Sequence, residues 1–132
     1  MTKERLRRYV WLKREEYQLK QRLDTIMAEL ATVSSPDLSG MPHSSEPTRL
    51  DSLVIRFEDI ADRYAKKLEE TQKELAAIER AVESLEDPRL RLLIRYKYID
   101  GLRWETIADL MHYDVRWIYR LHGEALLVLA DK

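Results

Sequence analysis

The sequence predicts an all-α protein, because helix-forming residues dominate it and two long segments contain neither glycine nor proline. Of the 132 residues, only 3 are Gly and 4 are Pro, whereas 45% are apolar and 36% are charged. This composition is too apolar for a disordered chain and too rich in helix formers for a sheet protein. The length allows one domain or two small ones, and we expect a division into residues 1–85 and 86–132.

The first long segment, residues 2–33, is expected to form one helix. Apolar residues recur in it at alternating steps of three and four, which is a heptad pattern with one polar gap at Glu16. The members of this stripe are Tyr9, Leu12, Leu19, Leu23, Ile26, Leu30 and Val33.

The second long segment, residues 50–85, follows a proline-rich connector at residues 34–49, which no regular element fits. Two helical stripes joined by one connector predict an antiparallel hairpin, a self-associating coiled coil, or both. The second stripe consists of Leu50, Val54, Phe57, Ala61, Tyr64, Leu68, Thr71, Leu75, Ile78, Val82 and Leu85.

A third helix is expected at residues 88–99. Asp87 suits the position before a helix because its carboxylate accepts from free amides, and Pro88 suits the first helical position because it lacks a donor. The pair Asp100-Gly101 is typical of a turn that ends such a helix.

Residues 104–123 fit a helix-turn-helix, with helices at 104–111 and from Val115 to about Ala130. Ala108 supplies the small side chain that two closely crossing helices need, and His112 takes the turn position where glycine is usual. The expected inward apolar residues are Ile107, Met111, Tyr113, Ile118 and Leu121, and Trp117 is also expected to pack in the core.

The second helix of such a unit enters the major groove of DNA. Its outward positions are Asp114, Val115, Arg116, Tyr119 and Arg120. Arg116 and Arg120 share a face, and a guanidinium fork matches the two acceptors of guanine. Asp114 is interpreted first as the cap of this helix.

The stretch from Asp87 to Leu129 resembles region four of bacterial sigma factors, which contacts the upstream promoter element and RNA polymerase. It is most similar to the phage and prophage sigma-like regulators of the ArpU and RinA type, and the connector at residues 34–45 is similar to theirs. The residues that carry the likeness are Trp104-Glu105, Ile107-Ala108, the run Ile118 to Gly123, and Ala125-Leu126.

That resemblance implies a DNA-binding role for Asp114, Val115, Arg116, Tyr119 and Arg120. Arg103 stands where the family often has a serine cap, and we expect it to contact a phosphate. Trp104, at the start of the same helix, completes the candidate DNA-binding residues.

Other classes of function find little support in the sequence. Cysteine is absent, no two histidines have the short spacing of a metal site, and no nucleophile elbow or phosphate loop occurs. We therefore expect no enzyme, no catalytic residues, no metal and no cofactor. No segment suits a signal peptide or a membrane span, and we expect a cytoplasmic protein of a bacterial host.

The sequence thus predicts a regulator of phage or prophage transcription that binds double-stranded DNA, with RNA polymerase as a further partner. The two stripes, with Leu127 and Val128, exceed what one thin hairpin covers, which predicts a homodimer. Two alternatives remain: a small terminase-like DNA-packaging protein, and a structural adaptor that binds protein only.

Overall fold

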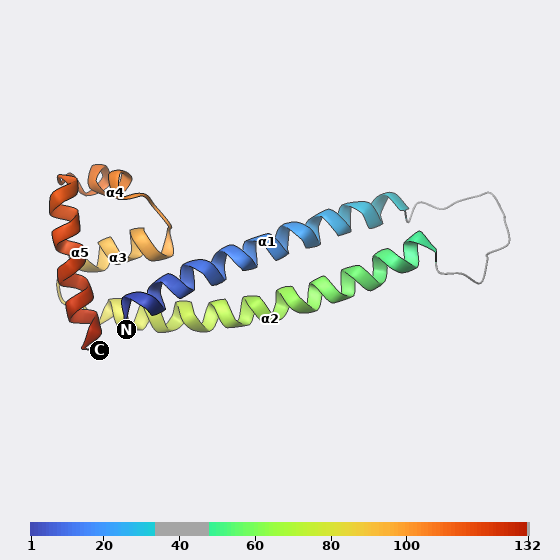
Figure 1. Ribbon diagram of the computed structural model, residues 1–132, viewed down its shortest axis with the longest axis horizontal. Helices are drawn as coiled ribbons and strands as arrows, with labels where there is room; N and C mark the ends of the chain where they lie inside the picture. The colour runs from blue at the N-terminus through green and yellow to red at the C-terminus, as the bar shows by residue number, and fades with distance from the viewer. Residues whose placement is uncertain (34–47, 132) are drawn as a thin grey trace. The chain divides into compact units, whose positions relative to one another are not determined.

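A computed structural model of the protein describes residues 1–33 and 48–131, and all regular elements in these ranges are helices. The all-α prediction is confirmed for this part of the chain. Most of the predicted connector, residues 34–47, lies outside the described residues. The elements are α1 (Lys3–Val33), α2 (Arg49–Glu83), α3 (Pro88–Ile94), the π-helical turn η1 (Arg95–Ile99), α4 (Trp104–Met111) and α5 (Val115–Ala130) (Figure 1).

Side-chain caps mark the starts of α2 and α3. Thr48 and Asp51 form a capping box at the start of α2, because each side chain accepts from the other residue's amide, at 3.1 and 3.0 Å. Asp87 caps α3 by accepting from the amide of Arg89 at 2.9 Å, and Pro88 takes the first helical position. The predicted start at Asp87-Pro88 is therefore confirmed.

The chain divides into two compact units. We call Met1–Lys13 together with Glu70–Lys132 the terminal unit, and Arg14–Glu69 the helix-pair unit. Each long helix contributes to both units. The division expected at residue 86 stays a prediction.

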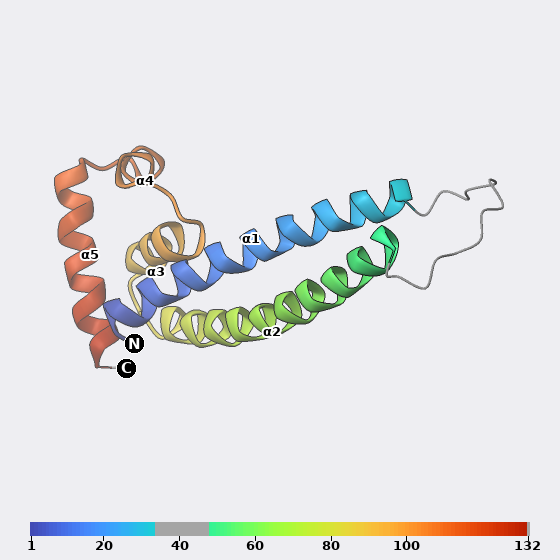
Figure 2. The same cartoon turned by 45° about the vertical axis from the view of Figure 1, so that its right-hand side comes forward.

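In the helix-pair unit, the segments of α1 and α2 lie side by side and run in opposite directions in both views (Figures 1 and 2). Ile26, Leu53 and Ile60 are buried there. At the start of α2, the stripe residues Leu50 and Val54 are exposed within this chain, and the neighbouring Leu53 is buried instead. One residue turns a helix by about 100°, so a stripe through Leu53 instead of Val54 selects a different face.

The core of the terminal unit combines both ends of the chain. Leu6 and Tyr9 come from α1, and Ile78 and Val82 come from the end of α2. The remaining buried members come from the segments after α2: Leu85, Leu90, Leu93, Ile94, Tyr98, Ile107, Ala108, Ile118, Leu121, Ala125 and Leu129.

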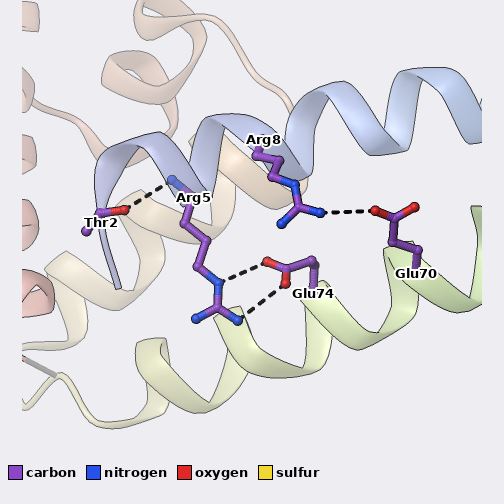
Figure 3. Close-up of polar contacts among 5 residues, drawn as sticks. All are labelled: Thr2, Arg5, Arg8, Glu70 and Glu74. Atoms are coloured by element: carbon purple, nitrogen blue, oxygen red, sulfur yellow. Dashed lines mark hydrogen bonds and ion pairs between the residues drawn. The ribbon is translucent and has the colours of Figure 1, made fainter.

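Opposite charges join α1 to α2 within the terminal unit (Figure 3). Arg5 donates from Nε and Nη2 to the carboxylate of Glu74, at 3.1 and 3.3 Å, and Arg8 donates to Glu70 at 3.1 Å. Two acidic residues of α2 are therefore paired within the chain.

Burial within one chain changes the sequence argument for a dimer. Ile78 was counted as part of a seam open to a second copy, but it is fully buried, and Leu75 is half-buried against the same core. Leu127 and Val128 remain exposed, by 74% and 41%.

Candidate nucleic-acid interface

Helices α4 and α5 are joined by the short turn His112–Asp114 and are held together by apolar contacts. Ile107 and Ala108 of α4, and Ile118 and Leu121 of α5, all belong to the buried core. Met111 packs against this core as a partly buried side chain. Four of the five predicted inward positions are thus placed at the core, as is the small residue Ala108.

The end of α4 is closed by two backbone hydrogen bonds. The amide of Tyr113 donates to the carbonyl of Ala108 at 3.0 Å, and the amide of His112 donates to that of Asp109 at 3.3 Å. This pair is the Schellman arrangement, which requires a left-handed residue after the helix. His112 supplies it with φ 59° and ψ 40°. The expectation that His112 takes the position usual for glycine is confirmed.

The start of α5 is fixed by Asp114. Its extended backbone precedes the helix, and its carboxylate accepts from the amide of Arg116 at 3.3 Å. The carbonyl of Asp114 accepts from the amides of Trp117 and Ile118 at 2.9 and 3.1 Å. The predicted capping role of Asp114 is confirmed.

The predicted DNA-binding residues fall into two groups. The half-buried ones are Trp104 and Val115, which pack against the core. The exposed ones are Arg103, Asp114, Arg116, Tyr119 and Arg120. The first two turns of α5 therefore present charged and aromatic side chains to solvent.

Two aromatic residues expected inside are at the surface. Tyr113 and Trp117 are each 37% exposed, so their assignment to the core was wrong. The buried face of α5 follows Ile118, Leu121 and Ala125, and Trp117 lies about 100° around the helix from Ile118. The spacing did contain a signal, because Trp117 is three residues from both Asp114 and Arg120, which puts it on their side of the helix.

Trp117 and the two arginines of α5 border one hollow. Asp114, Arg116, Trp117 and Arg120 line it. The guanidinium carbon of Arg120 lies 5.5 Å from the centroid of the Trp117 ring, within the range of a cation–π contact. The ring of Tyr113 is 6.4 Å from that of Trp117 and inclined by 59°.

The arginines of the terminal helices differ in what they contact. Arg89 bonds Asp87, Arg91 donates to the carbonyls of Leu85 and Glu86, and Arg95 pairs with Glu83. By contrast, within residues 1–33 and 48–131 the structure gives no ion pair for three other exposed arginines, which are Arg103, Arg116 and Arg120. Exposed arginines of α1 and α2 such as Arg22 and Arg56 also have no ion pair to a described residue. What distinguishes Arg116 and Arg120 is that they lie about one turn apart on the exposed side of α5.

Behind the exposed face lies a polar and aromatic cluster. The hydroxyl of Tyr98 and Nε2 of His122 are hydrogen-bonded at 2.7 Å, and the ring centroids of His122 and Trp104 lie 4.7 Å apart in an edge-to-face arrangement. Lys97 lies 4.3 Å above the Trp104 ring. Burial, aided by the charges of Lys3, Lys97 and Arg7, lowers the pKa of His122 to about 4. The imidazole of His122 is therefore neutral near pH 7, and it packs against Trp104 at the start of α4.

Comparison with known proteins adds no relative to this description. No family model matches this chain. No similar protein was found among the curated proteins, and no similar chain among the solved structures. In the described ranges, no helix is both long enough and apolar enough to cross a membrane. The same ranges contain no group of three or more His, Cys, Asp or Glu residues arranged to hold a metal ion.

Proposed function

We propose that the chain is a sequence-specific DNA-binding regulator of transcription, with α4 and α5 as a helix-turn-helix and α5 in the major groove. The resemblance to sigma region four and to the ArpU and RinA type of regulators assigns it to phage or prophage genes. In this proposal Arg116 and Arg120 contact base edges, and Arg103 contacts a phosphate.

The placement of three exposed arginines at α4 and α5 carries the proposal. Arg89, Arg91 and Arg95 are bonded within the chain, whereas Arg103, Arg116 and Arg120 are exposed with no ion pair to a described residue. An arginine that makes no internal bond can give its whole donor fork to guanine or to a phosphate. Three such arginines at one pair of helices are suited to binding a polyanion such as DNA.

The small positive charge of this surface also favours a dimer of the chain. Asp114 lies next to Arg116 and offsets part of its charge, so one copy of α5 has limited affinity for phosphates. A two-fold dimer presents two copies to two half-sites and raises both affinity and specificity. The proposal therefore includes a homodimer and, by the sigma resemblance, a contact with RNA polymerase.

The first experiment is selection of binding duplexes from a random-sequence pool by the full chain, followed by light scattering of the complex. We expect enrichment of a motif that contains guanine in two related half-sites, and the mass of two chains. A ring of many chains would favour a DNA-packaging protein instead. Absence of any enrichment would overturn DNA binding and favour an adaptor that binds protein.

Arginine variants test the assigned face. Arg116→Ala and Arg120→Ala should each weaken binding to the enriched duplex by about 1–3 kcal/mol, the usual contribution of a bidentate contact to guanine. Thermal stability should stay unchanged because both side chains are exposed. Arg22→Ala is the matched control, since it removes the same charge from an exposed position in the helix-pair unit. Equal binding by all three variants would contradict the assignment.

A further inference from the structure

We propose that Trp117 is a positioning residue of the DNA-binding face, whose indole ring directs the guanidinium of Arg120 toward a guanine. This inference rests on the proposed function and specifies how one of its contacts is prepared. The sequence placed Trp117 in the core, so no DNA-binding role was expected for it.

Three observations place Trp117 in this role. Its side chain is 37% exposed at the start of α5, so part of the indole ring is open to a partner. The ring borders the same hollow as Asp114, Arg116 and Arg120. The guanidinium carbon of Arg120 lies 5.5 Å from the centroid of this ring.

The indole ring itself has an aromatic neighbour. The centroid of the Tyr113 ring lies 6.4 Å from that of Trp117, and the two ring planes are inclined by 59°. An aromatic neighbour at this distance limits the movement of the indole ring.

A supported arginine binds better than a freely rotating one. An exposed Arg side chain loses rotamer freedom when it binds a base, and a guanidinium that already stacks on an aromatic ring loses less. The donors of a guanidinium lie in the plane of its fork, so a guanidinium whose face lies against a ring keeps them available to the two acceptors of guanine. The expected contribution is roughly three- to tenfold in affinity, as for other cation–π contacts.

The test is a double-mutant cycle on the enriched duplex, with full-chain variants. Trp117→Leu should weaken binding roughly three- to tenfold and reduce discrimination against a duplex in which the contacted guanine is replaced. Trp117→Phe should retain part of the effect because it keeps a ring. In the Arg120→Ala background, Trp117→Leu should change nothing further. Trp11→Leu is the matched control, because Trp11 is 61% exposed on α1.

Each outcome separates this inference from the function on which it rests. If the wild-type chain enriches a motif but Trp117→Leu binds it equally well, only the role of Trp117 is overturned. If the loss persists in the Arg120→Ala background, Trp117 contacts DNA itself and the positioning role is wrong. If no motif is enriched, the proposed function fails and this inference fails with it. Circular dichroism checks that each variant is folded.

Discussion

His112 shows how one residue determines the path between α4 and α5. A residue with a Cβ atom in the left-handed region costs roughly 1–2 kcal/mol, yet His112 adopts φ 59° there. The two hydrogen bonds to Ala108 and Asp109 satisfy carbonyls at the end of α4 and offset part of this cost. The position is predictable from sequence because the geometry of a helix end is local.

Trp117 shows what could not be predicted at this scale. The start of α5 offers apolar side chains at Val115, Trp117 and Ile118, which together cover more than one face of a helix. Only the partner surface decides which of them is buried. Ile118 joins Ile107 and Leu121 in the core, and Trp117 is left at the edge.

His122 should make the stability of the terminal unit depend on pH. Its pKa is about 4 in the folded protein, mainly through burial, and 6.5 is the ordinary value. Folding therefore favours the neutral imidazole, and the stability that this preference contributes is fully present above a pH of about 6.5. The unfolded chain takes up the proton first as the pH falls, so stability should decrease by up to about 3 kcal/mol between pH of about 6.5 and 4.

Denaturant unfolding at a series of pH values measures this effect. The variant His122→Gln, which does not titrate, should lose much less stability over the same interval. Asp51 and Asp87 have lowered pKa values because they accept hydrogen bonds from Thr48 and Arg89, so their contributions are lost at lower pH. Parallel pH profiles of the wild type and the variant would show that His122 is not the responsible group.

The elements themselves were largely predictable. The caps at Asp87 and Asp114 and the turn at Gly101 are local signals, and the helices they bound were placed correctly. The π-helical turn η1 was missed, because its wider bond from the amide of Asp100 to the carbonyl of Arg95 has no simple sequence pattern. The contact between Lys97 and the Trp104 ring depends on tertiary packing, so no sequence pattern predicts it either.

Two glycines should respond in opposite ways to the same substitution. Gly101 has φ +69° and room for a methyl group, so Gly101→Ala should destabilise the protein by about 1 kcal/mol through backbone strain alone. Gly123 lies inside α5 with equally open space, and Gly123→Ala should stabilise it by about 0.5–1 kcal/mol. Denaturant unfolding of both variants measures the difference. Effects of the same sign would contradict the backbone explanation.

Ala108 tests the contact between α4 and α5. Its side chain is 4% exposed and it belongs to the core with Ile107 and Ile118. Two additional methyl groups have no room there, and Ala108→Val should cost about 1–3 kcal/mol. DNA binding should fall with stability because the two helices move apart. Leu110→Ala, at an exposed position of the same helix, is the control. An Ala108→Val protein that melts like the wild type would place the close contact elsewhere.

At the scale of the whole molecule, α4 and α5 depend on distant parts of the sequence. Leu6 and Tyr9 of α1 belong to the same buried cluster as Ile107 and Ile118. The sequence stripe of α1 correctly included Tyr9, but periodicity alone could not show which helices it would contact. The core of the proposed DNA-binding unit is therefore completed by residues from the first helix.

A pair of tyrosines on α1 tests this dependence. Tyr9 is 2% exposed and Tyr17 is 63% exposed. Tyr9→Ala should lower the free energy of unfolding by about 3–5 kcal/mol, the usual cost of truncating a buried aromatic residue, whereas Tyr17→Ala should have a small effect. Hydrogen exchange adds the positional information: the amides of Ile107 and Ile118 should exchange faster in Tyr9→Ala, because the terminal unit loses stability as one body. If those amides stay as protected as in Tyr17→Ala, the helices α4 and α5 are stable without α1, and their fold does not need the first helix.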